Sequence, residues 1–321
     1  MKIPRLLGLV ALAAACSTPE GSIELTTGGE TDTFTRAPKP TSITVETIDG
    51  DGKVETLFSG PIGATLDLGE RERSKVAALV VTAKDDAGVV RVRGRTLALE
   101  LGVLEKVALK IYVQRTGETA RAPGTFSAPE APILDTVQGR YVLAAGGGVT
   151  RVAFYDLLGW TQSPASPTLK APPDSLVVLD TQILSIAGAS ASVYDLSTGT
   201  IADVSTPAGS SFAAVAGGRT IYAPDGGAYV VGATRATGEP TTAVLRVSKE
   251  GTLSFGNLAA PRLGAGATWV DGRGIVVVGG SPTAPGAEVL PVGGAPGAAR
   301  PQPPPPPSGR GAGTHDAPRG V

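Results

Sequence analysis

The stretch LAAPRLGAGATWVDGRGIVVVGG, residues 258–280, carries the pattern that decides the fold. It contains a first apolar segment, the dipeptide Asp271-Gly272, a second apolar segment rich in Val, and a closing glycine pair. An Asp-Gly dipeptide supplies the positive φ angles that a tight hairpin turn requires. A continuous apolar run is typical of a strand that is buried on both faces. The stretch therefore predicts two antiparallel strands within a buried sheet.

The same order of apolar strand, glycine and returning strand occurs at four places in the chain. Gly188 follows Gly147 by 41 residues, Gly232 follows by a further 44, and Gly280 by a further 48. Periods of 40 to 50 residues with four strands in each unit are typical of β-propeller blades. The sequence therefore predicts four blade-like sheets over residues 128–292. The glycines expected to end buried strands are Gly146, Gly147, Gly188, Gly232, Gly279 and Gly280.

These residues resemble the kelch repeat, most closely in the fourth sheet and least in the third. In that family a Pro-Arg pair precedes the first strand, an Asp-Gly turn joins it to the second, and a glycine pair ends the second. The next strand often carries Tyr-Asp, and a Trp follows, which Trp160 matches loosely. The resemblance implies a kelch-like β-propeller over about half of the chain. The matching positions are Pro261, Arg262, Asp271, Gly272, Gly279, Gly280, Tyr155, Asp156, Tyr194 and Asp195.

Four blades are fewer than kelch propellers generally have. We therefore expect either an open arc or a strained small propeller, with residues 293–321 unpaired. That tail is rich in Gly, Ala, Pro and Arg, and includes the run Pro303–Pro307. Such composition is typical of a disordered segment that favours polyproline II structure. A shifted reading frame that replaced further blades is the alternative interpretation of the tail.

Residues 41–121 show a different pattern of short alternating segments. Residues Ser42 to Ile48 alternate strictly between apolar and polar side chains, and a turn over Asp49 to Gly52 leads into a return strand. Alternation of this kind predicts strands with one buried face. Six or seven such strands in about 80 residues favour a small immunoglobulin-like β-sandwich, with a β-barrel as the alternative. The predicted fold class is thus all-β throughout.

The N-terminus has the features of an export signal. Lys2 and Arg5 precede an apolar run of about ten residues, which is too short to span a bilayer. The run ends in small residues and the chain's single cysteine, Cys16, and this resembles the lipobox of bacterial lipoproteins. The resemblance implies cleavage after Ala15, lipid attachment at Cys16 and a flexible tether over residues 16–40. The lipoprotein signal peptide would then cover residues 1–15, and an ordinary secretory signal is the alternative. Because Ser17 stands where Asp would favour inner-membrane retention, the expected location is the outer membrane of a Gram-negative cell.

Several kinds of chemistry have no support in the composition. The chain has 28 Lys and Arg against 29 Asp and Glu, so no basic field for nucleic acid exists. One histidine, His315, and one cysteine provide neither a catalytic triad nor a zinc site. We therefore predict no metal and no cofactor. Carboxylates remain as possible catalytic groups, and the candidates are Asp135, Asp156, Asp180, Asp195, Asp225 and Asp271.

These observations favour a non-enzymatic, lipid-anchored cell-envelope protein. Its partners would be the membrane, through the lipid, and a protein or glycan bound by the kelch-like propeller. A carboxylate-dependent hydrolase or lyase built on a propeller is one alternative function. A truncated relative without independent function is the other.

Overall fold

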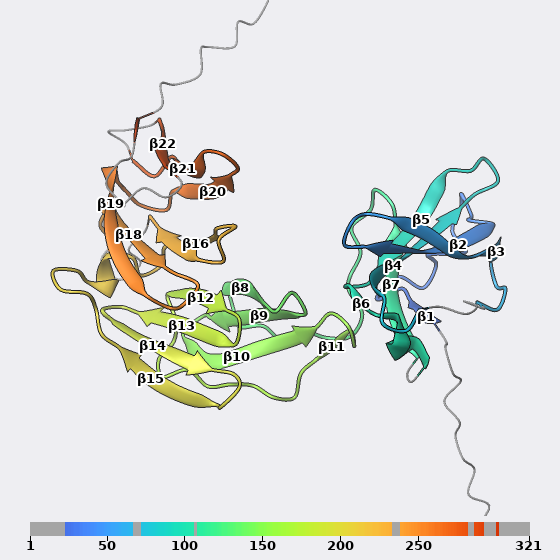
Figure 1. Cartoon of the computed structure of the whole chain (residues 1–321), viewed down its shortest axis with the longest axis horizontal. Coiled ribbons are helices and arrows are strands. Elements are labelled where there is room, and N and C mark those ends of the chain that lie inside the picture. The colour runs from blue at the N-terminus through green and yellow to red at the C-terminus, as the bar shows by residue number, and fades with distance from the viewer. Residues whose placement is uncertain are drawn as a thin grey trace, which may run out of the picture. The chain divides into compact units, whose positions relative to one another are not determined.

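The computed structural model describes residues 23–66, 72–105, 108–232, 238–281, 286–291 and 300–301. In these residues the chain is all-β apart from two short 3-10 helices (Figure 1). It divides into two compact units, which we call the N-terminal unit and the propeller unit. The N-terminal unit is Met1–Ser127 with Gly139–Tyr141 and Tyr155–Pro164, and the propeller unit is Ala128–Gln138 with Val142–Phe154 and Ala165–Val321.

The N-terminal unit is built on one seven-stranded sheet. The strand order is β1-β7-β5-β4-β2-β3, and β6 pairs with β4. Its elements are β1 Ile23–Thr26, β2 Ser42–Asp49, β3 Val54–Pro61, β4 Val76–Lys84, β5 Val90–Arg95, β6 Leu99–Glu100, the 3-10 helix η1 Leu101–Glu105 and β7 Leu109–Arg115. The expected turn over Asp49 to Gly52 joins β2 to β3, and the Asp49 carboxylate accepts hydrogen bonds from the backbone N–H groups of Asp51 and Lys53.

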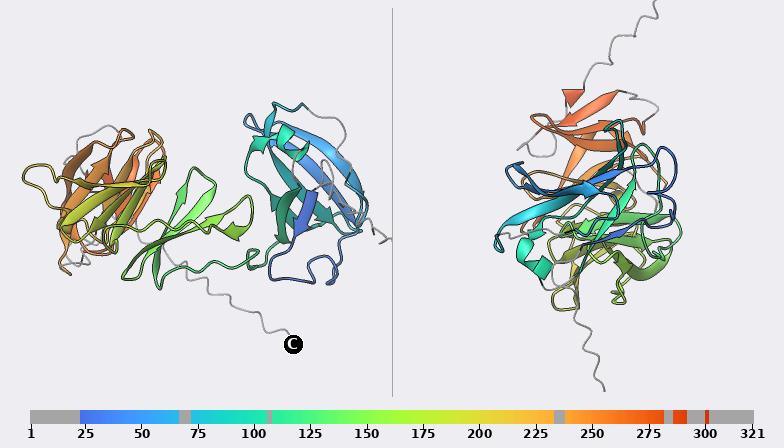
Figure 2. Two further views of the ribbon diagram at one scale, coloured as in Figure 1. Left: turned by 90° about the horizontal axis from the view of Figure 1, so that it is seen from below. Right: turned by 90° about the vertical axis from the view of Figure 1, so that its right-hand side faces the viewer.

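The described residues of this unit do not form the two facing sheets of the predicted immunoglobulin-like sandwich. The single sheet instead curls into a half-barrel (Figure 2), and its inward side chains pack on one another. Leu101 and Leu104 of η1 complete this core where a second sheet would otherwise cover it. Because alternation reports only that one face of a strand is buried, it did not distinguish a curled sheet from two packed sheets.

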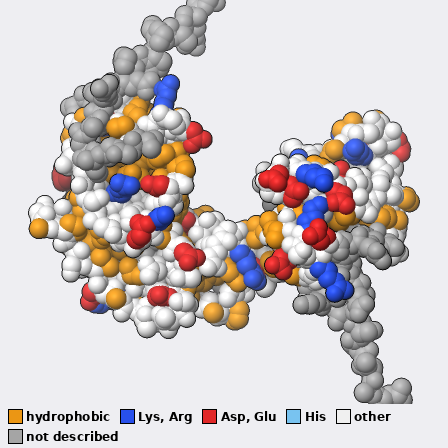
Figure 3. Space-filling view, viewed as in Figure 1, with side chains coloured by type: hydrophobic (Ala, Val, Ile, Leu, Met, Phe, Trp, Pro, Cys, Tyr) orange, Lys and Arg blue, Asp and Glu red, His pale blue; other side chains and the backbone are white. Residues whose placement is uncertain are grey.

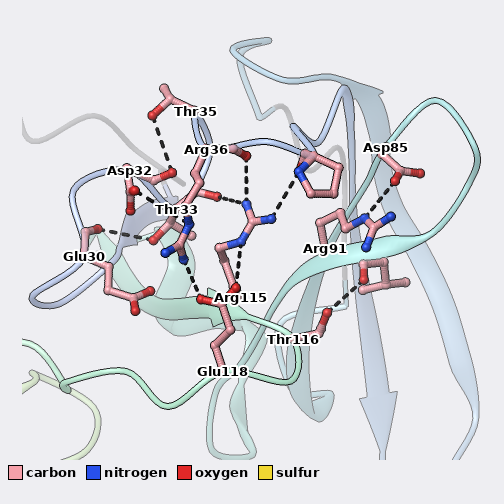
Figure 4. A network of polar contacts seen from close by, with 12 residues as sticks. Glu30, Asp32, Thr33, Thr35, Arg36, Asp85, Arg91, Arg115, Thr116 and Glu118 are labelled. Atoms are coloured by element: carbon pink, nitrogen blue, oxygen red, sulfur yellow. Dashed lines mark hydrogen bonds and ion pairs between the residues drawn. The ribbon is translucent and has the colours of Figure 1, made fainter.

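The prediction of a flexible tether over residues 16–40 does not hold for residues 23–40, the part of this segment that the structure describes. Ile23–Thr26 form β1, which pairs in parallel with β7. The guanidinium of Arg115 at the end of β7 then donates hydrogen bonds to the carbonyl oxygens of Thr33, Arg36 and Pro38 (Figure 4). The polar composition of this segment indicated a linker, but hydrogen bonds from Arg115, which is distant in the sequence, hold its backbone in place. Residues 16–22 lie outside the described residues.

Four sheets of four strands follow, in a propeller-like arrangement (Figure 1). The first sheet is β8 Pro132–Val137, β9 Tyr141–Gly146, β10 Val149–Asp156 and β11 Thr161–Gln162. The second is β12 Ser175–Leu179, β13 Gln182–Ala187, β14 Ser190–Asp195 and β15 Thr200–Val204. The third is β16 Arg219–Tyr222, β17 Ala228–Val231, β18 Thr241–Val247 and β19 Leu253–Arg262. The fourth is β20 Gly266–Val270, β21 Gly274–Val278, β22 Ala287–Leu290 and β23 Arg300–Pro301.

Neighbouring sheets are held together by apolar cores. One core joins the second and third sheets through the alternate residues Leu184 and Ile186 of β13 and Val230 of β17. The 3-10 helix η2, Phe212–Ala214, inserts the fully buried Phe212 into it. Another core joins the third and fourth sheets through Val231, Ile275 and other aliphatic side chains. Burial on both sides explains why the middle strands carry continuous apolar runs.

The second strand of every sheet ends at a glycine with positive φ. These glycines are Gly147, Gly188, Gly232 and the pair Gly279-Gly280, with φ between 56° and 79°. A Cβ on Gly280 would lie 2.8 Å from the backbone nitrogen of Ala265, so both the conformation and the space at this position require glycine. The local pattern of the sequence therefore located the same turn in all four sheets.

The prediction that residues 293–321 are unpaired is wrong at one place. Arg300–Pro301 form β23, which pairs with Glu288 and Val289 of β22. Proline has no backbone N–H to donate to a neighbouring strand. Pro301 is tolerated here because β23 is the last strand of its sheet and pairs on one side only. The rest of the tail, residues 293–299 and 302–321 with the run Pro303–Pro307, lies outside the described residues.

Candidate functional site

A cavity of about 490 Å³ lies where the first strands of the sheets approach one another in the propeller unit. Strands β8, β12 and β16 all contribute to its wall, together with the glycine-containing segments that precede β16 and β20. Its volume is within the roughly 300–1,000 Å³ of typical small-molecule sites. The lining residues are Pro132, Ile133, Leu134, Asp135, Asp174, Leu176, Gly217, Gly218, Arg219, Thr220, Tyr222, Val231, Gly232, Gly264 and Ala265.

Asp135 and Tyr222 connect three of the sheets across this cavity. The Tyr222 hydroxyl of β16 donates a hydrogen bond to the Asp135 carboxylate of β8 and accepts one from the backbone N–H of Val178 at 2.9 Å. The backbone N–H of Thr136 donates to the same carboxylate at 2.7 Å. Burial raises the pKa of Asp135, although its hydrogen bonds oppose the shift. Burial, and then the nearby Asp135 charge, raise the pKa of Tyr222.

Further hydrogen bonds keep the wall of the cavity in place. The Thr220 hydroxyl donates to the backbone carbonyl of Leu176. The Ser175 hydroxyl accepts from the backbone N–H of Gly217 at 2.8 Å and donates to the carbonyl of Gly218 at 3.1 Å. Both contacts join the second sheet to the third. These polar groups are already engaged, and they fix the shape of the cavity.

Arg219 differs from the other polar residues that line the cavity. Its side chain is exposed, and it has no ion pair or hydrogen bond within the part of the chain that the structure describes. The exposed apolar side chain of Leu134 lines the same cavity. A free guanidinium offers five N–H donors in a planar fork. Together these groups form a site suited to a ligand with an anionic or carbonyl group beside an apolar part.

The six candidate catalytic aspartates do not meet in one place. Only Asp135 lines the cavity. Asp180 lies in the β12–β13 turn, Asp225 in the β16–β17 turn and Asp271 in the β20–β21 turn. In the β14–β15 turn the Asp195 carboxylate accepts hydrogen bonds from the Ser197 backbone and hydroxyl.

Asp156 has a structural partner at the end of β10. Its carboxylate accepts two hydrogen bonds from the guanidinium of Arg140, at 3.0 and 2.6 Å, and one from the backbone N–H of Leu158. The hydrogen bond from Arg140 is the largest cause that lowers the pKa of Asp156. Its neighbour Tyr155 donates a hydrogen bond to the carbonyl of Pro123 within the N-terminal unit. In the corresponding place of the second sheet, Tyr194 pairs with Ile183 and Ile201 on the adjacent strands.

Arg262 of the Pro261-Arg262 pair is a buried structural residue at the end of β19 in the third sheet, and it pairs with Glu288 of the fourth sheet. Its guanidinium donates to both the Glu288 carboxylate, at 3.2 Å, and the backbone carbonyl of Gly279, at 2.6 Å. The Asp271-Gly272 turn joins β20 to β21 as expected, and the Asp271 carboxylate accepts a hydrogen bond from the Trp269 indole. Glu288 was not identified from the sequence. A single carboxylate within the apolar segment that forms β22 was the available signal.

Trp160, the loose match to the family's Trp, packs within the N-terminal unit. Its ring lies 5.1 Å from that of Tyr112, and its indole N–H donates to the carbonyl of Lys110 at 3.3 Å. The lipidation and cleavage positions, Cys16 and Ala15, lie outside the described residues. Arg219 and Tyr222 were also missed, because the groups that make them significant come from other sheets.

Comparisons with known proteins leave the family open. No protein-family model matches the chain, and no curated protein matches it. One similar solved structure is described as "Crystal Structure of Mitotic Checkpoint Complex", with 11% identity and a TM-score of 0.29 over 87% of this chain and 93% of that chain. A likeness this weak carries no argument about function.

Membrane-spanning helices and metal-binding clusters are both absent from the described residues. No helix among them is long and apolar enough to cross a membrane. Within the same residues, no group of three or more His, Cys, Asp or Glu side chains is placed to hold a metal ion. Positive and negative side chains lie intermixed on the visible face of the molecule (Figure 3), in line with the balanced composition.

Proposed function

We propose that this chain is a non-enzymatic, lipid-anchored cell-envelope protein whose kelch-like propeller binds a protein or glycan partner. The partner would bind at the cavity lined by Asp135, Arg219 and Tyr222, which we call the central cavity. The observation that carries the proposal is the cavity of about 490 Å³ with Arg219 at its wall, a residue whose guanidinium has no partner among the residues that the structure describes. Asp135, Tyr222 and Thr220 hold that wall through hydrogen bonds between sheets. A preformed wall lowers the ordering cost of binding, and a free guanidinium supplies a specific polar contact.

The binding half of the proposal is tested with the full chain on a glycan array and against a displayed peptide library. We expect at least one probe class to bind, and Arg219→Ala to weaken that binding about tenfold or more, which corresponds to about 1.4 kcal/mol. Arg273→Ala is the matched control, because Arg273 is exposed in the β20–β21 turn away from the cavity. Equal binding by wild type and Arg219→Ala would contradict the proposed site.

The anchoring half rests on the signal-like N-terminus that ends in Cys16. One acyl chain gives only marginal membrane affinity, so firm anchoring needs two or more chains. We expect cells grown with a clickable fatty acid to label the wild-type protein, and Cys16→Ala to abolish the label. Label retained by Cys16→Ala would refute lipid attachment at this residue, whatever the array shows.

A further inference from the structure

A second cavity, of about 630 Å³, lies over the second sheet of the propeller unit. Ser185 and Ala187 of β13 line it, as do Ser190 and Ser192 of β14 and Asp203 of β15. In the strand register Ser185 lies opposite Ser192, and Ser192 lies opposite Asp203, so the three side chains share one face of the sheet. The alternate residues Leu184 and Ile186 point to the other face and form the core with the third sheet. We call this cavity the serine groove.

Two serine residues of the serine groove are almost fully buried, while their hydroxyl oxygens stay accessible from the groove. Ser185 is 3% exposed and Ser192 is 7% exposed. Neither hydroxyl makes a hydrogen bond to any residue that the structure describes. A molecule in the groove that presents donors and acceptors could therefore bind two adjacent hydroxyl groups that no described residue engages.

The rim and walls of the groove restrict the chemistry of such a molecule. The Lys170 ammonium donates to both oxygens of the Asp203 carboxylate, at 2.6 and 2.7 Å, and both side chains remain exposed. The apolar lining is Val204 and small Ala side chains, with no aromatic residue among those that form the groove. An apolar anchor would therefore find little surface to contact. A compact, hydroxyl-rich molecule would find hydroxyl, ammonium and carboxylate partners.

We propose that the serine groove is a saccharide-binding site that takes one or two sugar rings. Sugar hydroxyls would pair with Ser185 and Ser192 at the floor and with Asp203 and Lys170 at the rim. The volume of about 630 Å³ suits a small ligand of this size. The proposal rests on the groove alone and does not depend on a ligand in the central cavity.

Saturation-transfer-difference NMR and calorimetry on the full chain test this proposal. The probes are glucose, galactose, mannose, N-acetylglucosamine and disaccharides of each. We expect at least one to bind the wild-type chain. The double variant Ser185→Ala/Ser192→Ala should weaken its affinity about tenfold or more, because two hydrogen bonds to the sugar are lost. Ser254→Ala, an exposed serine of β19, is the matched control and should leave the affinity unchanged.

Three results of this experiment would overturn the proposal. No binding of any probe to the wild-type chain, or equal binding by the double variant, would overturn the proposal. Loss of sugar binding in Arg219→Ala with retention in the double variant would assign the sugar to the central cavity and also overturn it. If circular dichroism shows that the double variant does not fold, Ala187→Leu replaces it. This substitution fills the groove without removing a hydroxyl, and it should abolish binding.

Discussion

Arg115 in the N-terminal unit and Arg262 in the propeller unit are both almost fully buried, with 4% and 2% exposure. Arg115 donates to three backbone carbonyls, and the one carboxylate it contacts, Glu118, is 40% exposed. Arg262 faces Glu288, which is 2% exposed. Arg115 thus holds the backbone of residues 33–38 by hydrogen bonds, whereas Arg262 belongs to an ion pair that is buried away from water.

The two environments differ in what remains when one partner is lost. Around Arg115, the carbonyls of Arg36 and Pro38 belong to exposed residues that water can reach, and only Thr33 is fully buried. Around Arg262, the loss of either Arg262 or Glu288 would leave the other charge unpaired in the interior. Breaking a buried pair costs much more than the pair contributes when it is intact. The Arg262–Glu288 pair, which joins the third sheet to the fourth, is therefore expected to be the more sensitive of the two regions.

The largest effect is expected for Glu288→Ala. This change leaves the Arg262 guanidinium buried without its carboxylate and removes the acceptor of the Ala259 backbone N–H. We expect the free energy of unfolding of the propeller unit to fall by about 3–5 kcal/mol. The measurement is urea unfolding followed by Trp269 fluorescence in a Trp160→Phe background, because the chain has two tryptophans, one in each unit.

Glu250→Ala is the control for this change, since Glu250 is an exposed carboxylate in the β18–β19 turn. It should leave the Trp269 transition unchanged. A loss below about 1 kcal/mol in Glu288→Ala would mean that water reaches Arg262, because only exposed pairs contribute so little. The contrast between the two arginines would then be wrong.

Arg115→Met is expected to have the second largest effect. The change removes the donor to the carbonyls of Thr33, Arg36 and Pro38 but keeps an apolar stem of similar length. Because water can replace the donor at the exposed carbonyls, we expect a loss of about 2 kcal/mol, mostly from the buried Thr33 group. Trp160 fluorescence in a Trp269→Phe background reports this loss. An effect as large as that of Glu288→Ala would remove the distinction between the regions.

The comparison also shows which parts of the fold the sequence could predict. The four sheets and their glycine turns follow from local signals: apolar runs, Asp-Gly dipeptides and positive-φ glycines at a regular period. The resemblance to kelch repeats drew attention to Arg262 as well. The order of residues 23–40 could not be predicted in this way, because its cause, Arg115, lies 82 residues after Thr33 in the chain.

The candidate site was less predictable for the same physical reason. The hydrogen bond from Tyr222 to Asp135 joins residues that are 87 positions apart. Asp135 was a candidate, but its neighbours in the cavity become visible only when the sheets are placed around it. The two unpartnered hydroxyls of the serine groove depend on strand register, and serine within a strand carries no distinguishing signal of its own. Residue type and spacing thus located the scaffold better than the sites on it.

A smaller effect is expected from pH, and it should separate the two units. Hydrogen bonding by Arg140 lowers the pKa of Asp156 in the N-terminal unit. A carboxyl group with a lowered pKa stabilises the folded state above its unfolded pKa, about 3.9, and this stabilisation is lost as the pH falls through the folded pKa. Burial instead raises the pKa of Asp135 in the propeller unit, so acid relieves a cost there.

Acid should therefore destabilise the N-terminal unit before it affects the Asp135 region. We expect the Trp160 transition to lose about 1 kcal/mol between about pH 5 and pH 3, a value kept small because the Asp156 pair is partly exposed. Asp156→Asn should remove part of this dependence, because the pKa values of Asp85 and Glu55 in the same unit are lowered as well. Asp271→Asn, in the β20–β21 turn, should leave the dependence unchanged. An unchanged pH profile in Asp156→Asn would show that other carboxyl groups cause the acid sensitivity.

The smallest effect is expected for Glu118→Gln, which tests the comparison at its weakest contact. Glu118 accepts a hydrogen bond from Arg115 at 3.3 Å and one from Arg36 at 2.5 Å, but its carboxylate is 40% exposed. Water and salt screen such a pair, and the amide retains one oxygen as an acceptor. We therefore expect a loss below about 0.5 kcal/mol in the Trp160 transition, decreasing further in 1 M NaCl. A loss of 2 kcal/mol or more would show that Arg115, like Arg262, depends on its carboxylate, and the carbonyl contacts would no longer explain how residues 33–38 are held.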